Sequence, residues 1–422
     1  MELKKISKGT FLAYHTADRF KTTELSLSLL APLDERTTCR ALLLQLLART
    51  SKQYPTTFLM NRRLASLYGA TITPVIHKHG EIQVLSLVLS CVDDRFALDR
   101  ESICKAGIEL LCDCLLLPDV GENGFQEENI AREKQLLRQK LDGEKDDKRV
   151  YALHRMTEEM CKDEPYRRNA NGCREELDAI DGKQLFDCWK DLMLHAQVLV
   201  SFVGSTAPEV LTETLHARLG GVEKTDLPEL RTEFLTESYG SHVIKETQDV
   251  NQGKLVIGYR AGMTYDMDNY AAIRLMTAIF GGGTFSKLFL NVREKMSLCY
   301  YCSARLLRNK GLIVVESGVE TENADRALEA IRNELDEVRA GNFTDETLTQ
   351  AKRALTDSLY SVTDSNMTTL SWLENFGVSG TFYTPQQIAQ MLETVSREEV
   401  ILAANMVSED TVFILESGKK EA

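Results

Sequence analysis

The chain has 422 residues, of which 43% are hydrophobic and 27% charged, a balance typical of a globular protein with two or more domains. Its formal net charge of −13 argues against broad binding to nucleic acid or anionic membranes, which requires clustered Lys and Arg. The N-terminus lacks the apolar stretch of a signal peptide, and no apolar run is long enough for a membrane helix. We therefore expect a cytoplasmic protein whose ten scattered cysteines are free, buried thiols.

An internal repeat organises the predicted elements. Gly311 corresponds to Gly80 at an offset of 311 − 80 = 231, and the same offset relates Ala272 to Ala41. Each half predicts a strand, two helices, a hairpin of two strands around a short Gly turn, and a closing helix. These elements span residues 25–31, 39–48, 56–67, 70–78, 82–91 and 100–116 in the first half, and 255–261, 269–280, 285–294, 298–307, 312–319 and 323–339 in the second.

The rest of each half continues with helices and a final strand. Antiparallel hairpins with helices gathered on one face indicate an α+β protein of two homologous domains, each an antiparallel sheet flanked by helices. The polar stretch around Pro228 predicts a linker at 221–240, between an N-terminal domain at 1–220 and a C-terminal domain at 241–422. The remaining predicted elements are helices at 126–141, 149–162, 182–192, 345–376, 385–392 and 397–406, and strands at 196–203 and 412–415.

One segment of the second half carries a family resemblance. It reads GGGTFSKLF from Gly281, then REK at 293–295 and LCY ending at Tyr300. This order resembles the second-domain signature of the insulinase (pitrilysin-type, mitochondrial-processing-peptidase-like) zinc metallopeptidase family. The run FTDETL from Phe343 and the run DEPY from Asp163 are similar to further family segments, so the resemblance covers nearly the whole chain. It implies the LuxS/MPP-like metallopeptidase fold in both domains.

A narrower resemblance points to non-catalytic bacterial members of this family, of the YmfF/YfmF type. It is carried by YPT from Tyr54, by LYGA from Leu67, and by the missing metal motif described below. Such members are found beside an active paralogue and have been linked to modification of translation elongation factor P. That link follows from the resemblance alone.

The zinc site of active family members is absent from this sequence. Those members carry His-x-x-Glu-His on the first helix, where two imidazoles one turn apart hold zinc and the Glu acts as general base. The motif falls here on Leu43, Leu46 and Leu47. The third ligand follows the Glu of a Glu-Arg-like pair by seven residues, which from Glu133 leads to 133 + 7 = 140, Lys140. The resemblance therefore implies no metal, no cofactor and no peptide cleavage by this chain alone.

A pair of histidines in the first half is a candidate for a substitute metal site. His77, His79 and Glu81 alternate, so a regular strand places them on one face. A zinc site usually needs three or four supported ligands, which favours a polar hairpin tip beside Gly80 instead.

Two cysteine pairs have short spacings. Cys299 and Cys302 are expected on opposite faces of a strand because side chains alternate, and Cys112 and Cys114 lack a second pair at the spacing of a zinc site. Buried structural thiols are therefore favoured over a redox or zinc role.

The resemblance also implies roles for residues that are retained. Arg293 and Tyr300, seven apart, match a pair that faces zinc across the substrate chamber, where the phenol donates to an oxyanion and the guanidinium holds a substrate carbonyl. Arg293 capping its own helix while Tyr300 fills strand space is the structural alternative. Gly281, Gly282 and Gly283 form no phosphate loop, because no Lys-Ser/Thr follows; they favour a flexible helix stop with close backbone approach.

Two functions remain open at this point. The first is a catalytically incomplete subunit that forms a heterodimer with an active paralogue, which holds the zinc, and helps to bind a peptide substrate. The second is a non-enzymatic scaffold with the same fold. A homodimer in isolation also stays open, whereas an independent zinc peptidase is excluded by the first helix.

Overall fold

The computed structural model describes residues 1–98, 101–122, 124–238, 240–263 and 269–418. The chain divides into two compact units, and each is assembled from segments that are not consecutive in sequence. Unit 1 comprises Met1–Leu141, Arg168–Arg231 and Val362–Thr384, and unit 2 comprises Asp142–Arg167, Thr232–Ser361 and Pro385–Ala422. The sequence predicts two contiguous domains divided by a linker at 221–240. In the structure, residues 142–167 of the first half pack in unit 2, and residues 362–384 of the second half pack in unit 1.

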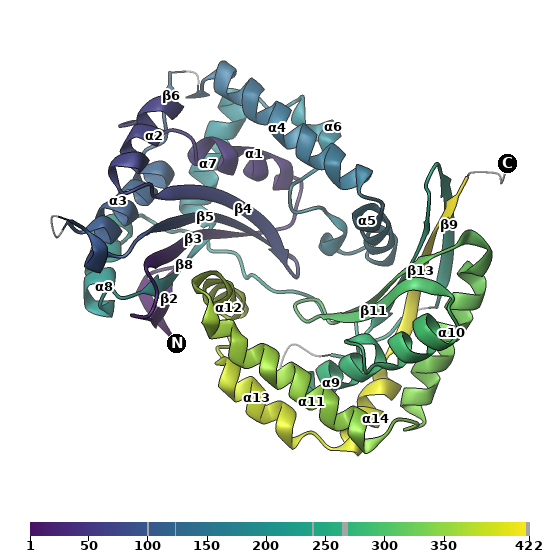
Figure 1. The fold of residues 1–422 in the computed structure, drawn as a ribbon. Coiled ribbons are helices and arrows are strands. Elements are labelled where there is room, and N and C mark those ends of the chain that lie inside the picture. The colour runs from purple at the N-terminus through teal and green to yellow at the C-terminus, as the bar shows by residue number, and fades with distance from the viewer. Residues whose placement is uncertain (99–100, 123, 239, 264–268, 419–422) are drawn as a thin grey trace. The chain divides into compact units, whose positions relative to one another are not determined.

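Unit 1 is a six-stranded sheet with helices on both faces (Figure 1). The strands follow the order β1-β2-β8-β3-β5-β4, and a separate two-stranded ladder joins β6 and β7. The strands are β1 (Glu2–Ser7), β2 (Thr10–Thr16), β3 (Thr22–Pro32), β4 (Thr71–His79), β5 (Ile82–Val92), β6 (Val120–Gly121), β7 (Gly124–Phe125) and β8 (Gln197–Gly204). The helices are α1 (Thr37–Leu47), α2 (Thr57–Ser66), α3 (Ile103–Leu116), α4 (Glu127–Asp146), α6 (Arg174–Leu177), α7 (Gly182–His195), α8 (Pro208–Leu219) and α12 (Asn366–Ser379).

The central strands of unit 1 are buried on both faces. Leu27 of β3 faces a large core that also contains apolar residues of α1, α3 and α7. The neighbouring Leu30 faces a second core with Leu199 of β8 and Leu370 and Leu373 of α12. Cover on both faces explains why nearly every residue of β3 and β5 is buried, including the serines that alternate with leucines in β3.

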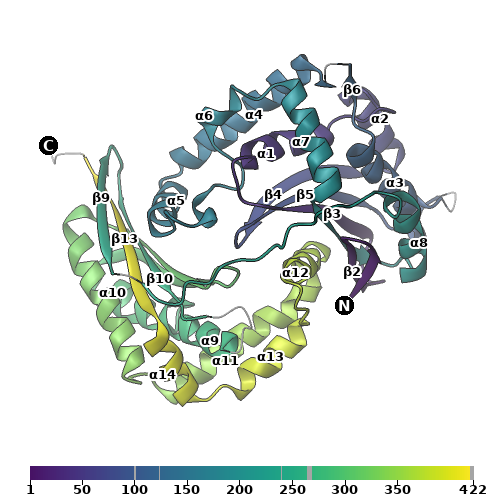
Figure 2. The same ribbon diagram turned by 180° about the vertical axis from the view of Figure 1, so that it is seen from behind.

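Unit 2 repeats this plan with five strands (Figure 2). Their order is β11-β12-β10-β13-β9, so β11 is an edge strand. The strands are β9 (His242–Gln248), β10 (Gly253–Arg260), β11 (Cys299–Leu307), β12 (Leu312–Val319) and β13 (Ser408–Ser417). The helices are α5 (Lys148–Met160), α9 (Tyr270–Gly281), α10 (Ala324–Arg339), α11 (Asp345–Tyr360), α13 (Pro385–Thr394) and α14 (Arg397–Met406), with a π-helical segment at Leu288–Lys295.

Helix α5 covers one face of the unit 2 sheet, although it precedes that sheet by about eighty residues of chain. Met156 and Met160 of α5 pack against Gly258 of β10, where a Cβ atom would lie 2.5 Å from the Met160 sulfur. A side chain at position 258 would therefore have to displace the two methionine side chains at this close approach of helix and strand. Phe413 of β13 completes the same apolar cluster.

The two sheets share one topology. Reversed, the unit 2 order is β9-β13-β10-β12-β11, which matches β2-β8-β3-β5-β4 of unit 1 strand for strand. The predicted α+β class of two similar layers is confirmed. The sequence predicts purely antiparallel sheets. The structure differs in one strand pair of each sheet, because β2 pairs with β8 and β9 pairs with β13 in parallel.

The segment between the end of α8 and the start of β9 has no helix or strand in its described residues. Within unit 1, the Thr225 amide donates to the Leu194 carbonyl at 3.0 Å, which anchors this part of the segment to α7. Across the described part of the chain, no helix is both long and apolar enough to span a membrane.

Candidate functional site

The three leucines at the positions of the zinc motif lie in the core of unit 1. Leu43, Leu46 and Leu47 of α1 are 0%, 3% and 1% exposed and pack with the leucines of β3 and β5. Helix α1 is apolar on nearly all sides, as expected of a helix enclosed by other elements. The positions to which the resemblance assigns two zinc ligands and the general base are therefore packing positions, and an imidazole or carboxylate there would lack water and partners.

The position of the third ligand is also occupied by other interactions. Lys140 lies exposed on α4, and its Nζ donates to Asn171 Oδ1 at 2.8 Å. Glu133, two turns earlier on α4 and only 1% exposed, lies 3.1 Å from Arg132 Nε and 3.6 Å from Arg49 Nε. A cation and neutralised acid at this place do not supply the donor set that zinc requires.

The His77–Glu81 cluster joins α12 to the sheet. His77 Nε2 lies 3.6 Å from Glu374 Oε2, and His79 Nε2 lies 2.9 Å from the Asn375 carbonyl oxygen. Both histidines therefore face α12, whereas Glu81 lies in the turn after β4. No group of three or more His, Cys, Asp or Glu with metal-binding geometry occurs among the residues that the structure describes.

Arg293 and Tyr300 are brought together in unit 2. Arg293 lies in the last turn of the π-helical segment, and its Nε donates to the Tyr300 carbonyl oxygen at 3.0 Å. Its guanidinium carbon stands 4.6 Å from the centre of the Phe289 ring, and its Nη1 lies 3.3 Å from Glu294. The guanidinium is thus held in one orientation by the chain's own backbone and an aromatic face.

Tyr300 lies at the surface, on edge strand β11. It is 61% exposed, and its hydroxyl donates to Glu320 Oε1 at 2.5 Å. This hydrogen bond to a carboxylate, together with the negative charge of Glu320, raises the pKa of Tyr300 above its ordinary value. The phenol is therefore protonated at neutral pH and able to donate.

The backbone around this pair departs repeatedly from regular geometry. The Met296 amide bonds to the Asn291 carbonyl in the i to i+5 pattern of a π-helix, and Ser297 has a φ of 51°. The ladder between β11 and β12 then shifts register between Cys299 and Tyr301, so Tyr300 is the extra residue of a β-bulge. Such irregularities are costly and concentrate at functional positions.

The bulge also corrects one expectation from the sequence. Cys299 and Cys302 do not lie on opposite faces: the Cys302 thiol donates a hydrogen bond to the Cys299 sulfur. That bond, partly offset by burial and helped by Ser317 and Arg293, lowers the pKa of Cys299 to about 7. Strict alternation failed because the inserted residue changes the period of the strand.

The other predicted residues serve packing. Gly281 ends α9 against β11, where a Cβ atom would lie 2.5 Å from the Ala304 nitrogen. Gly282 follows as the C-cap of α9, and at Gly283 a Cβ atom would lie 2.8 Å from the Phe285 ring.

The thiols of Cys112 and Cys114 are both fully buried in α3. Burial raises the pKa of each to about 12, as expected of unreactive thiols.

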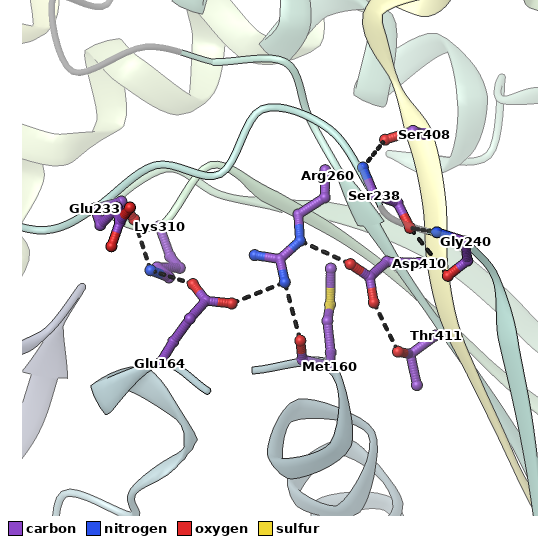
Figure 3. A network of polar contacts seen from close by, with 10 residues as sticks. All are labelled: Met160, Glu164, Glu233, Ser238, Gly240, Arg260, Lys310, Ser408, Asp410 and Thr411. Carbon is purple, nitrogen blue, oxygen red and sulfur yellow. Dashed lines mark hydrogen bonds and ion pairs between the residues drawn. The ribbon is translucent and has the colours of Figure 1, made fainter. Parts of the chain in front are cut away.

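Sequence reasoning missed a buried charge network in unit 2 (Figure 3). Arg260 at the end of β10 donates to Asp410 Oδ2 and Glu164 Oε1, each at 2.8 Å, and to the Met160 carbonyl at 2.9 Å. Lys310 Nζ reaches the second Glu164 oxygen at 2.6 Å. The partners are 96 to 150 residues apart, so no local pattern marks them, although Glu164 lies within the DEPY run.

Comparisons with known proteins agree with this geometry. The family described as "Peptidase M16 inactive domain" matches residues 179–355. The "Probable inactive metalloprotease YmfF" of Bacillus subtilis is 29% identical over 415 residues, covering 98% of this chain and 97% of that protein. The "Uncharacterized zinc protease YmxG" of the same organism is 24% identical over 256 residues, covering 58% of this chain and 59% of that protein.

Solved structures share the fold over the full length. A crystal structure of a conserved protein from Enterococcus faecalis superposes with a TM-score of 0.90 at 23% identity, covering 100% of this chain and 99% of that one. A peptidase M16 inactive domain from Pseudomonas fluorescens superposes with a TM-score of 0.81 at 17% identity, with the same coverage. Residues 179–355 are thus similar to the peptidase M16 inactive domain, and nearly the whole chain is similar to the probable inactive metalloprotease YmfF.

Proposed function

We propose that this chain is the non-catalytic subunit of a two-chain peptidase, in which a zinc-bearing paralogue supplies the metal and this chain supplies Arg293 and Tyr300 to the peptide. One observation carries the proposal. The tyrosine of the family signature is exposed at a β-bulge of an edge strand, and the signature arginine is fixed beside it. The metal positions of the same chain, by contrast, have been absorbed into a core.

The chemistry of this surface suits an extended peptide. A sheet edge offers main-chain donors and acceptors to an added strand. The Tyr300 hydroxyl, protonated at neutral pH, can donate to the oxygen that becomes negative when water attacks a peptide carbonyl. The remaining nitrogens of Arg293 can hold a second carbonyl of the same peptide.

Glu320 sets a condition on this role. Since the Tyr300 hydroxyl donates to Glu320 at 2.5 Å, it must leave that carboxylate before it can donate to a substrate. The tyrosine is exposed, so water or substrate can compete for the hydroxyl at modest cost. Substitution of Glu320 therefore distinguishes two roles of the Tyr300 hydroxyl: donation to a substrate, or stabilisation of the edge strand.

The same contact favours a second candidate, a non-enzymatic scaffold. In that function the hydrogen bonds from Arg293 to the Tyr300 backbone and from the Tyr300 hydroxyl to Glu320 only stabilise the surface. The surface then binds another protein and takes no part in peptide cleavage. The two candidates differ in what removal of one hydroxyl does to peptide cleavage.

The test uses the complex of this chain with a zinc-bearing family paralogue from the same genome, co-expressed and purified. If Tyr300 stabilises the oxyanion, Tyr300→Phe lowers kcat by about 10²–10³-fold with the complex intact, whereas Glu320→Gln keeps the activity. Arg293→Ala changes KM and kcat together. Tyr360→Phe, which removes an exposed hydroxyl from α11, serves as the matched control.

Two results would reject the proposal. Equal cleavage by wild-type and Tyr300→Phe complexes leaves only the scaffold function. Failure of the two wild-type chains to form a complex at micromolar concentration removes the pairing itself.

A further inference from the structure

A cavity of about 580 Å³ lies in unit 1 between α1 and α7. Two cysteines that are 188 − 39 = 149 residues apart in sequence line it, Cys39 from α1 and Cys188 from α7. Cys39 is partly exposed and Cys188 is buried, and neither is in a disulfide. The cavity therefore gives a small molecule access to the more open of the two sulfurs.

The two thiols line the same cavity from neighbouring helices. Cys39 Sγ lies 3.9 Å from the carbonyl oxygen of Gln184, which is one helical turn before Cys188 on α7. The Cys188 thiol donates a hydrogen bond to the Cys39 sulfur. Their helices pack directly on each other, so a bond between the sulfurs would link two neighbouring elements of one unit.

Electrostatics make the pair unequal. The hydrogen bond from Cys188 is the main cause that lowers the pKa of Cys39, against burial and with help from the cations of Arg40 and Arg36. Arg40 is 4% exposed and fixed by Asp34 at 2.9 Å, so its charge cannot swing away. The same hydrogen bond and burial raise the pKa of Cys188. Cys39 is thus suited to attack, and Cys188 to resolve.

We propose that Cys39 and Cys188 are a redox-active dithiol, which exchanges with a low-molecular-weight disulfide entering the cavity and closes a disulfide bond between α1 and α7. The inference goes beyond peptide cleavage, because it concerns unit 1 alone and is measured on the isolated chain.

The exchange balances without any further reactant. The Cys39 thiolate attacks one sulfur of the small disulfide, breaks its S–S bond and releases one small thiolate. Cys188 then loses its proton and attacks the Cys39 sulfur of the mixed disulfide, which releases the second small thiolate. The two protein thiols are oxidised, the small disulfide is reduced, and the two protons go to the released thiolates.

The charge of the cavity predicts which disulfide reacts. Four carboxylates line it, Glu35, Glu176, Asp187 and Asp191, against the single guanidinium of Arg36, which already binds Asp191 at 2.8 Å. A dicationic disulfide should therefore enter more readily than an anionic one. We expect cystamine to oxidise the pair at least about tenfold faster than oxidised glutathione at low ionic strength, and the ratio to fall with salt.

The experiment treats the reduced full-length chain with each of these two disulfides and maps thiols and crosslinks by mass spectrometry. The expected product is a Cys39–Cys188 crosslinked peptide that forms through a transient adduct on Cys39. Cys188→Ser should stop at the stable Cys39 adduct, and Cys39→Ser should leave Cys188 unmodified. Cys299→Ser, which removes an acidified thiol of unit 2, is the matched control and should leave the crosslink unchanged.

Thermal melting gives an independent readout. Because the bond closes a loop of 149 residues, the oxidised chain should melt on the order of 5–10 °C higher than the reduced chain, and the Cys188→Ser adduct should not. If the wild-type chain keeps a stable adduct on Cys39, Cys188 does not act as the resolving thiol. If no adduct forms on Cys39 and no crosslink appears, Cys39 is not a reactive thiol. Either result overturns the proposal.

Discussion

Two regions to which the family resemblance assigns chemistry have opposite surroundings in this structure. In unit 1, the metal positions Leu43, Leu46 and Leu47 are enclosed in a leucine-rich core. In unit 2, Arg293 and Tyr300 remain polar, partly or largely exposed, and surrounded by an irregular backbone. Once a catalytic position becomes apolar, burial stabilises the fold and the change is hard to reverse, whereas an exposed pair costs little to keep.

The acids that the two exchanged segments contribute are bound by different kinds of partner. In unit 1 the buried Glu374 accepts hydrogen bonds from Ser28 and Ser86, at 2.5 and 2.7 Å. In unit 2, Glu164 binds the cations of Arg260 and Lys310. Both acids come from the exchanged segments, so each sheet is joined by polar contacts to a helix or turn from the other half of the sequence.

The largest effect should come from an attempt to rebuild the metal motif. The triple change Leu43→His, Leu46→Glu and Leu47→His places three polar groups in a dry core and removes its leucine packing. We expect a loss of at least about 5 kcal/mol in the free energy of unfolding, which is comparable with the whole stability of many domains. Far-UV circular dichroism and urea titration measure it.

Leu136→Glu is the matched control for this triple change, because Leu136 is 43% exposed on α4. It should change the free energy of unfolding by less than about 0.5 kcal/mol. A folded triple variant that binds one zinc per chain would break the comparison, since the metal position would then be restorable rather than absorbed.

A smaller but still large effect is expected at the buried network of unit 2. Burial favours the protonated form of Glu164, but hydrogen bonds and charges from Arg260 and Lys310 outweigh it and lower the pKa of this carboxyl. Glu164→Gln leaves two buried cations short of a partner and should cost about 3–5 kcal/mol at neutral pH, by denaturant titration.

The pH dependence of this effect has a definite sign. The contribution of a carboxylate with a lowered folded pKa is present above its unfolded pKa of about 4.3, and is lost as pH falls through the lower folded value. The stability difference between wild type and Glu164→Gln should therefore shrink on acidification. Glu346→Gln, at an exposed position of α11, is the control; a difference that grows in acid would contradict the assignment.

The smallest effect concerns the retained pair itself. Because Glu320 raises the pKa of Tyr300 by hydrogen bond and charge, Glu320→Gln should lower that pKa toward the ordinary tyrosine value. Ultraviolet titration of the variant, with Tyr300→Phe to identify the signal, measures the change. An unchanged titration would mean that the Tyr300–Glu320 contact does not persist in solution, and that the hydroxyl is already available to a partner.

The sequence by itself determined the α+β class and the internal repeat, and through the family resemblance it predicts which residues replace the metal motif. Each of these is local information: apolar runs and Gly turns show strands and hairpins over a few residues, and Leu43 or Lys140 is read directly at its motif position. The sequence does not decide whether Tyr300 is exposed. The seven-residue spacing fits a substrate-facing pair, and it fits equally an Arg293 that caps its helix with a Tyr300 that fills space in the strand.

Tertiary structure alone decided the rest. Residues 142–167 and 362–384 pack in the unit of the opposite half, because α5 and α12 bury their apolar faces on those sheets. The bulge at Tyr300 brings Cys299 and Cys302 to one face, against simple alternation. Cys39 and Cys188 meet because their helices pack together, and no sequence pattern encodes a contact across 149 residues when each partner alone resembles an ordinary core cysteine.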